Sequence, residues 1–288
     1  MGVLNVVDLS GRVAIVTGGA SGIGRSTARQ LACVGAAVAI ADINGEGAEE
    51  VVRGIRSAGG DALAITTDVA QPPQVESMVE RVVSHFGALH ILCNNAADLS
   101  LLERDRDLLQ TDIETWNRTW EADLRSVMVA SKHALPHMLA AGGGAIVNVS
   151  SVDGASGDNT RFAYATAKAG INVLTQCMAV AYGKSGVRCN AILPGLVLSP
   201  AATDTLEAHP AIREIFLDNV LTPHLGTPEE IASVIVFLAS DAASYVNGQL
   251  IRVDGGLLSH VPHLAQHEKY FATLAPSGKA PSDGAANA

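Results

Sequence analysis

The sequence predicts an α/β fold in which parallel strands alternate with helices. An apolar run of strand length, 13–17, ends abruptly in the glycine-rich stretch Gly18–Gly24. Further apolar strand candidates alternate with helix-length segments almost to the end of the chain, which is typical of a parallel sheet. The 288 residues are 48% hydrophobic and 17% charged, so one large domain or two small ones with a substantial core can form.

Each expected element follows from this alternation. After the first strand, strands are expected at 37–41, 62–66, 89–93, 145–151, 186–193 and 249–253. Helices are expected at 25–32, 46–58, 74–86, 112–140, 162–183 and 228–240. Residues 98–110 should form a surface loop or short helix, and 196–223 an irregular segment. Because parallel strands end at one edge of the sheet, the turns that follow them should gather at that edge.

Charge and cysteine content narrow the class of protein. The formal net charge is −10 and Lys and Arg do not cluster, which argues against a nucleic-acid-binding surface. No apolar run approaches the ~20 residues that a membrane helix needs, and the N-terminus lacks the pattern of a signal peptide. The four cysteines form no C-x-x-C pair and are expected to be buried free thiols. We therefore expect a cytoplasmic protein with no nucleic-acid or membrane partner.

The glycine-rich stretch is a candidate phosphate site. Gly18, Gly22 and Gly24 have the spacing G-x-x-x-G-x-G, with Ser21 and Ile23 between them. Residues without Cβ let the backbone turn tightly and approach a pyrophosphate, whose charge meets the free N–H groups of a helix N-terminus. The alternative is a turn that serves only strand-to-helix packing.

Two carboxylates follow later strands. Asp42 ends the second strand 18 residues beyond Gly24, where an acid can accept hydrogen bonds from an adenosine ribose and repel a 2′-phosphate. This favours NAD over NADP, although Asp42 could instead cap the next helix. Asp68 could contact an adenine amino group or cap the helix that begins near Pro72.

A candidate acid–base pair lies in Tyr164-Ala165-Thr166-Ala167-Lys168. Residues four apart share one face of a helix, so the phenol and the ammonium should be neighbours. A nearby cation lowers the pKa of a tyrosine, and the pair can then accept a proton from an alcohol or donate one to a carbonyl. Ser151 ends a strand 13 residues earlier and can hydrogen-bond the substrate oxygen, with Ser150 as the competitor for that role.

These motifs together resemble the short-chain dehydrogenase/reductase family in its single-domain form. The resemblance covers about Leu9 to Gly256, in the right order and spacing, and its motifs are the following: Thr17–Gly24, Asn94-Asn95-Ala96, Ser151, Tyr164-x-x-x-Lys168, Pro194-Gly195, Gly248-Gln249 and Val253–Gly256. It implies a single Rossmann domain, a doubly wound seven-stranded parallel sheet with helices on both faces. It also implies an NAD(P) cofactor and hydride exchange between nicotinamide and a carbonyl or alcohol.

The resemblance also implies residue roles. Tyr164 is the acid/base, Lys168 lowers its pKa and holds the nicotinamide ribose, and Ser151 orients the substrate oxygen. Gly18–Gly24 holds the pyrophosphate. The other cofactor contacts that it implies are Asp42, Asp68, Val69, Asn94, Asn95, Ala96, Pro194, Gly195, Val197 and Ser199.

Two positions depart from the family pattern. Ala97 stands where a glycine usually follows Asn94-Asn95-Ala96, and Asp123 stands at an asparagine that holds a water linked to the lysine. An acid at 123 can still accept hydrogen bonds from that water. Its charge favours protonated Lys168 and opposes phenolate at Tyr164. We therefore expect activity to be retained with a shifted pH optimum.

The leading hypothesis is an NAD-dependent dehydrogenase of a secondary alcohol, cyclic or otherwise of medium size. The alternatives are an NAD(P)H-dependent ketone reductase and a catalytically idle nucleotide-binding regulator. His260, His263 and His267 lack an accompanying carboxylate or thiol set, so no metal site is expected. The resemblance implies a homotetramer, or a homodimer, built on the long helices. Residues 257–288 should form a C-terminal extension, partly docked, with Ala275–Ala288 disordered.

Overall fold

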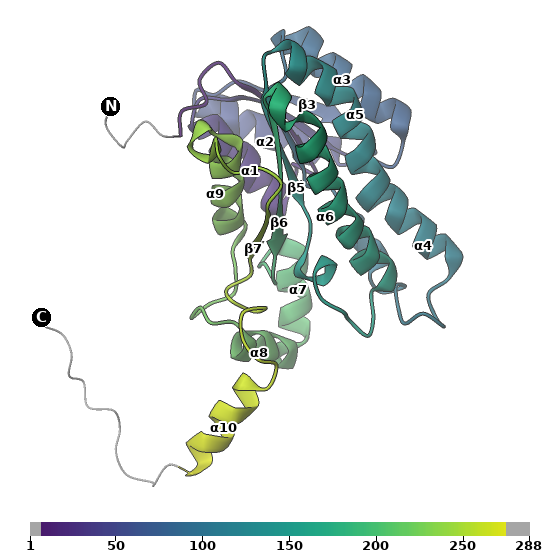
Figure 1. Cartoon of the computed structure of the whole chain (residues 1–288), viewed down its shortest axis with the longest axis vertical. Coiled ribbons are helices and arrows are strands. Elements are labelled where there is room, and N and C mark those ends of the chain that lie inside the picture. The colour runs from purple at the N-terminus through teal and green to yellow at the C-terminus, as the bar shows by residue number, and fades with distance from the viewer. Residues whose placement is uncertain (1–6, 275–288) are drawn as a thin grey trace, which may run out of the picture.

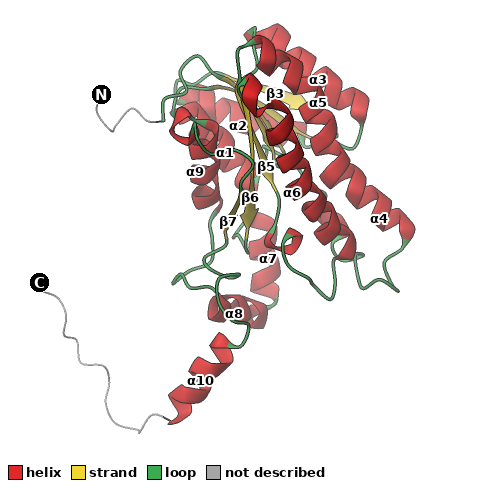
Figure 2. Cartoon of the chain, in the orientation of Figure 1, coloured by secondary structure: helices red, strands yellow, loops and turns green. Residues whose placement is uncertain are grey.

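The computed structural model describes residues 7–274, and the expectation for Ala275–Ala288 lies outside this range. Its centre is one parallel sheet (Figures 1 and 2). The strands follow the order β3-β2-β1-β4-β5-β6-β7. The strands are β1 Val13–Thr17, β2 Ala37–Asp42, β3 Ala62–Thr66, β4 Ile91–Asn94, β5 Gly144–Val149, β6 Val187–Pro194 and β7 Leu250–Val253. This confirms the predicted seven-stranded, doubly wound sheet.

Helices cover both faces of the sheet (Figure 1). Side chains alternate along a strand, so Ala14 and Val16 of β1 join one core while Val13 and Ile15 join the other. The first core includes residues of α1 (Gly22–Cys33), α2 (Gly45–Ser57) and α9 (Pro228–Ala239). The second includes residues of α3 (Pro72–Phe86), α5 (Ser126–Ala140) and α6 (Phe162–Tyr182). Because the strands are buried on both faces, their sequences are continuous apolar runs.

The single helix expected at 112–140 is wrong, because three helical segments occupy this range. Asp112 caps α4 (Ile113–Thr119) by accepting the Thr115 N–H at 2.7 Å. A π-helical turn at Trp120–Arg125 then leads into α5. A π turn holds an extra residue, which rotates the side chains relative to a continuous α-helix. The hydrophobic spacing continues through the turn and gives no sign of it.

The irregular segment expected at 196–223 is also wrong. It contains α7 (Pro200–Ala208) and α8 (Pro210–Asn219), each with proline in its first turn. Proline suits that position because it lacks an N–H that would have no partner there. Ser199 caps α7 by accepting the Ala202 N–H. Beyond β7, α10 (Leu264–Leu274) lies beside α8, where Lys269 forms an ion pair with Asp218. A domain boundary at Gly256 stays a prediction.

Two of the cysteines differ from expectation. Cys93 and Cys189 are buried in the sheet, whereas Cys33 and Cys177 are exposed on α1 and α6. Amphipathic helices place some apolar-looking positions on their outer faces, so the composition of the neighbours did not decide burial. Within residues 7–274, none of the helices combines the length and apolar character that crossing a membrane requires.

Candidate active site

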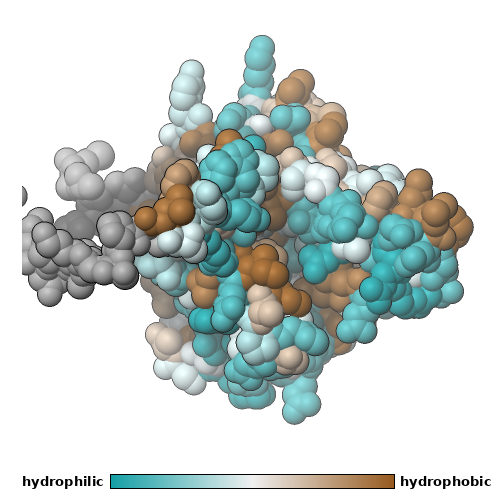
Figure 3. Space-filling model, turned by 90° about the horizontal axis from the view of Figure 1, so that it is seen from below, coloured by the Kyte–Doolittle hydropathy of each residue, from teal (hydrophilic) through white to brown (hydrophobic). Residues whose placement is uncertain are grey.

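The candidate site lies at the carboxyl edge of the sheet, around the ends of β1 and β4. The strand order reverses between these two strands, and ligands of open α/β sheets bind at such a switch point. In Figure 1 the strands run downward towards this edge, and α7 and α8 lie below it. Seen from below, apolar side chains occupy the middle of the face with polar ones around them (Figure 3).

The glycine turn after β1 has no room for a side chain at Gly18 or Gly24. Gly18 has φ +64°, and a Cβ there would lie 2.9 Å from Ala96 Cα. A Cβ on Gly24 would lie 2.1 Å from the carbonyl oxygen of Gly18. The Asn95 side-chain amide donates to the main-chain oxygens of Thr17 and Gly18 at 2.9 and 3.1 Å. The turn is therefore clamped against the end of β4.

The helix after this turn keeps its N-terminal N–H groups available. Ser21 is the N-cap of α1, yet its side chain makes no capping hydrogen bond, and the first turn contains no acidic residue. The first N–H groups of a helix have no intrahelical partner, and the helix dipole there favours an anion. Together with the glycines of the preceding turn, the N-terminus of α1 fits the pyrophosphate of a dinucleotide.

Asp42 contacts this turn and does not cap α2. Its Oδ2 accepts the Ala20 N–H and its Oδ1 accepts the Asn44 N–H, both at 2.9 Å. The N-cap of α2 is Asn44, which accepts the Gly47 N–H. Capping therefore does not account for Asp42, and its carboxylate stands at the end of β2 beside the glycine turn.

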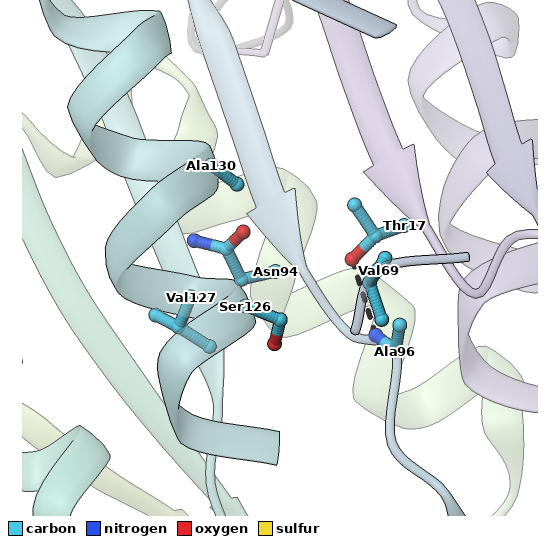
Figure 4. A pocket seen from close by; sticks show the side chains of 7 residues that line it. All are labelled: Thr17, Val69, Asn94, Ala96, Ser126, Val127 and Ala130. Atoms are coloured by element: carbon cyan, nitrogen blue, oxygen red, sulfur yellow. Dashed lines mark hydrogen bonds between the residues drawn. The ribbon is translucent and has the colours of Figure 1, made fainter. Parts of the chain in front are cut away.

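Asp68 also differs from the capping alternative. Its carboxylate accepts the Ala70 N–H at 2.9 Å, whereas the N-cap of α3 is Gln71. Val69 lines a narrow pocket with Thr17, Asn94 and Ala96 (Figure 4). The adenine position implied by the resemblance thus lies close to the end of β4.

The Asn94 side chain points into the interior, and its place beside the cofactor ribose stays a prediction. It is buried, and its amide donates to Asn148 Oδ1 at 2.8 Å and to Ser131 Oγ at 3.3 Å. Figure 4 shows this side chain on the α5 side of β4. Two interior polar groups therefore use the Asn94 amide, and the side chain that reaches the glycine turn is Asn95.

Ser151 and Ser150 have different surroundings. Ser150 Oγ is buried and donates to the Lys168 carbonyl oxygen at 3.0 Å, so it ties β5 to α6. Ser151 accepts the Asp153 N–H at 3.1 Å and forms a hydrogen bond with the Tyr164 hydroxyl. Ser151 is therefore the serine that faces the phenol.

Tyr164 and Lys168 are neighbours on α6, as their spacing predicts. The Lys168 Nζ lies 5.3 Å from the centroid of the Tyr164 ring and donates to the Val149 carbonyl oxygen at 3.2 Å. The lysine side chain is 3% exposed. The ammonium is thus held between α6 and the end of β5, beside the phenol.

Asp123 forms a buried pair with this lysine. The π turn directs Asp123 into the interior, where Oδ2 lies 4.0 Å from Lys168 Nζ. Oδ1 accepts the Asp98 N–H, whereas Oδ2 is buried without a hydrogen-bond partner. A buried polar atom of this kind usually has an ordered water or ligand atom as its partner.

Burial is the largest cause of the pKa shifts of Tyr164 and Lys168. Burial raises the pKa of the Tyr164 phenol, and the charges of Asp123 and Asp153 raise it further. The Ser151 hydrogen bond and the Arg161 charge oppose this increase. Burial likewise lowers the pKa of Lys168, against the opposing effect of Asp123. The expected lowering of the phenol pKa is therefore not achieved by these side chains alone.

The remaining predicted residues lie after β6. Gly195 donates its N–H to the Val253 carbonyl oxygen, and a Cβ there would lie 3.0 Å from Asp254 Cα. Pro194 ends β6, and Val197 is buried after it. The Cβ of Ser199 would lie 3.4 Å from a Cβ placed on Gly22. The start of α7 therefore lies against the glycine turn.

Two residues at the site were missed by the sequence reasoning. Thr17 Oγ1 accepts the N–H groups of Asn95 and Ala96 at 3.0 and 3.1 Å, which joins β1 to the turn after β4 (Figure 4). Asp105 is buried against the start of α6. Thr17 is the last residue of a strand, which is a usable signal. Asp105 lies among four other charged residues in 103–107, and nothing in that pattern marks it.

Comparisons with known proteins agree with this geometry. A family model described as enoyl-(acyl carrier protein) reductase matches residues 18–258. A cis-4-hydroxycyclohexanecarboxylate dehydrogenase of Sinomonas cyclohexanicum is 46% identical over 85% of this chain and 96% of its own length. A cyclohexanol dehydrogenase of Acinetobacter sp. (strain SE19) is 40% identical over 86% of this chain and 95% of its own.

Solved structures give the same answer. A 7α-hydroxysteroid dehydrogenase in complex with NADH and 7-oxo glycochenodeoxycholic acid superposes with a TM-score of 0.84 and 31% identity, over 89% of this chain and 98% of its own. Fold, motifs and relatives thus coincide over nearly the whole described chain. The chain belongs to the short-chain dehydrogenase/reductase family, oxidoreductases that use a nicotinamide cofactor and act on CH–OH groups.

Proposed function

We propose that this protein is an NAD-dependent dehydrogenase that oxidises a cyclic secondary alcohol of medium size to its ketone. The observation that carries the proposal is the meeting of Ser151, Tyr164 and Lys168 at the sheet edge, beside a glycine turn that fits a dinucleotide. Relatives at 46% and 40% identity are named for cyclohexane alcohols, which supports a cyclic substrate.

In this proposal the chain's own residues orient the alcohol and move one proton. Bound NAD supplies the acceptor for the hydride that leaves the carbinol carbon. The Ser151 hydroxyl hydrogen-bonds the substrate oxygen, and the Tyr164 phenolate oxygen takes its proton. Lys168 stabilises the phenolate by its charge, because its ammonium is held beside the ring.

Turnover of an alcohol panel tests the proposal. Cyclohexanol, 4-hydroxycyclohexanecarboxylate, a hydroxysteroid and a linear secondary alcohol are each incubated with the full-length protein and NAD, and the absorbance of reduced nicotinamide is followed. The cyclic alcohols are expected to react fastest. Tight NAD binding without turnover of any of them would contradict the proposal and favour an idle nucleotide-binding regulator.

The choice of NAD over NADP rests on Asp42. Its carboxylate lies at the end of β2 beside the glycine turn, where it would repel a 2′-phosphate. Asp42→Asn keeps an oxygen that can accept the Ala20 N–H but removes the charge. The ratio of kcat/KM with NAD to that with NADP should fall roughly tenfold. Asp61→Asn, an exposed acid just before β3, is the control and should leave the ratio unchanged. An unchanged ratio in Asp42→Asn would mean that Asp42 does not determine the choice between NAD and NADP.

The charge of Asp123 should set the pH dependence of oxidation. Asp123 raises the pKa of Tyr164, and oxidation requires the deprotonated phenol. Asp123→Asn removes that charge, so the pKa of Tyr164 falls and the rising limb of kcat against pH should move down by roughly one pH unit. An asparagine oxygen can still accept the Asp98 N–H.

The matched control is Glu121→Gln, which removes an acid in the same π turn that pairs with Arg125 at the surface. Its pH profile should coincide with that of the unmodified protein. If the Asp123→Asn profile coincided as well, Asp123 would have no electrostatic role at Tyr164.

Ketone reduction is the second candidate. The pKa of Tyr164 is raised by burial and by two carboxylates, so the phenol stays protonated at neutral pH. A protonated phenol is the proton donor that carbonyl reduction needs. The same residues then act in the reverse direction, with the reduced cofactor as hydride donor.

Two further expectations stay predictions. The homotetramer, or homodimer, is supported by exposed apolar side chains on the long helices, among them Met128 of α5 and Val173 and Val180 of α6. The cytoplasmic location rests on the sequence pattern alone.

A further inference from the structure

One segment near the site has contacts that the proposed mechanism does not use. It is the charged insert, residues 98–110, which follows the turn after β4. Its Asp105 is 1% exposed, although the flanking Arg104 and Arg106 are exposed. Burial of a carboxylate in a surface insert is costly unless hydrogen bonds compensate for it.

The compensating hydrogen bonds come from the catalytic helix. Asp105 Oδ2 accepts the main-chain N–H of Tyr164 at 2.8 Å, and Oδ1 accepts that of Ala163 at 3.0 Å. The carbonyl oxygen of Asp105 accepts the Arg161 N–H at 3.2 Å. Three hydrogen bonds therefore run from Asp105 to the N-cap residue and the first turn of α6.

These N–H groups have no partner within the helix. The first intrahelical bond at this end runs from the Ala165 N–H to the Arg161 carbonyl oxygen. Arg161 is the N-cap, with φ +59°, and its side chain makes no capping hydrogen bond. The cap of α6 is thus supplied by a residue 58 and 59 positions earlier in the chain.

The insert is also anchored at its beginning. The Asp98 N–H donates to Asp123 Oδ1 at 3.0 Å, and the other oxygen of Asp123 faces Lys168. The insert therefore extends from Asp123, which pairs with Lys168, to the backbone of Tyr164. It contacts the main chain of Tyr164 directly, and it reaches Lys168 through the Asp123 side chain.

We propose that Asp105 is a positioning residue that fixes Tyr164 through its backbone N–H and couples the insert to the acid–base pair. The proposal rests on the proposed role of Tyr164 in proton transfer. Hydrogen bonds to a charged acceptor are shorter and stronger than neutral ones, and two of them hold the first turn of α6 in one place. A small displacement of a reacting group lowers the rate strongly, so the position of this turn matters for turnover.

Asp105→Asn tests the proposal with little change in shape. The amide nitrogen of asparagine is a donor, so it must face one of the two N–H groups that the carboxylate now accepts. At a temperature well below the unfolding midpoint, kcat should fall roughly ten- to a hundredfold. The KM for NAD should stay within about twofold, because the glycine turn lies on β1 and does not contact Asp105.

Asp112→Asn is the matched control. Asp112 also caps a helix with its carboxylate, accepting the Thr115 N–H at 2.7 Å, but the helix is α4. It also pairs with Arg104 of the insert at 3.2 Å, so the variant disturbs the insert without touching the cap of α6. If the effect of Asp105→Asn is only the loss of a helix cap, the two variants should have equal kcat values, and that result would overturn the proposal. A fall in kcat confined to Asp105→Asn supports it.

A milder variant decides the matter if Asp105→Asn does not fold. Thr111→Val removes a hydroxyl that accepts the Arg106 N–H at 2.8 Å and whose one hydrogen lies near two acceptors, the Arg106 carbonyl oxygen at 3.0 Å and Asp105 Oδ1 at 3.3 Å. It should lower kcat by roughly two- to fivefold, again with an unchanged KM for NAD. An unchanged kcat in Thr111→Val, with Asp105→Asn unfolded, would overturn the proposal.

Hydrogen exchange separates this proposal from the proposed function. Exchange at the Ala163 and Tyr164 amides is measured on the protein alone, by mass spectrometry of peptides from the start of α6. It should accelerate roughly tenfold in Asp105→Asn and stay unchanged in Asp112→Asn. If the unmodified protein turns over no alcohol but exchange accelerates, the function fails and the positioning contact holds. Unchanged exchange at both amides overturns the positioning contact itself.

Discussion

Replacing Tyr164 with phenylalanine should lower kcat for alcohol oxidation by roughly 10²–10⁴-fold. The substitution removes the hydroxyl that takes the substrate proton and that hydrogen-bonds with Ser151. The ring remains, so its contact with the Lys168 ammonium at 5.3 Å can persist and α6 should keep its position. The measurement is kcat with the best alcohol of the panel, alongside the dissociation constant of NADH from its fluorescence.

The matched control is Tyr182→Phe, at the last residue of the same helix. It also removes one hydroxyl from α6, but at the end remote from the site, so kcat should be retained. NADH binding should be unchanged in both variants. If Tyr164→Phe kept more than about a tenth of the activity, a different group would have to be the base.

Gly24→Ala should abolish cofactor binding and destabilise the fold by roughly 1–3 kcal/mol. The added Cβ would lie 2.1 Å from the Gly18 carbonyl oxygen and 2.6 Å from Asn95 Nδ2. The first contact is with main chain, which cannot rotate away as a side chain can. The turn must therefore open, and the clamp that Asn95 forms on Thr17 and Gly18 is lost with it. Thermal unfolding and titration with NADH measure the two effects.

Gly54→Ala is a control that should change the stability in the opposite direction. Gly54 is exposed within α2, and a Cβ there would lie 3.6 Å from the nearest heavy atom. Alanine favours a helix over glycine, so the variant should be more stable by about 0.5–1 kcal/mol with unchanged NADH binding. Gly24→Ala with full affinity for NADH would contradict the role assigned to the bare turn.

The predicted fold was right because its signals are local. Each strand is an apolar run bounded by polar or glycine-rich turns, and parallel strands place those turns at one edge irrespective of detail. Spacing along one helix placed Lys168 beside Tyr164, and the strand end placed Ser151 opposite them. Those three positions needed no knowledge of distant contacts.

The sequence could not predict the features that a distant contact decides. Asn94 and Asn95 are adjacent in the sequence, but the alternation of β4 sends Asn94 into the interior towards Asn148 and leaves Asn95 to clamp the glycine turn. The π turn at Trp120–Arg125 changes which side chains face inward without altering the hydrophobic spacing. Residues 196–223 were expected to be irregular, although Pro200 and Pro210 begin the helices α7 and α8. The cap that Asp105 provides joins segments that are far apart in the sequence. Helix propensities are assigned to single residues, so they cannot predict such a contact.

The anchors of the insert bear on the exchange of loops between related enzymes. Positions 98 and 105 are two fixed points of the insert, and residues 99–104 lie between them. A graft confined to 99–104 can change length and chemistry beside the cleft while both attachments remain. A graft that replaces the whole insert also removes the cap of α6, and a chimera made in this way would lose activity whatever its new loop recognises. Substrate range and catalytic competence are therefore separable in this segment only when Asp105 is retained and residue 98 keeps a main-chain N–H for Asp123.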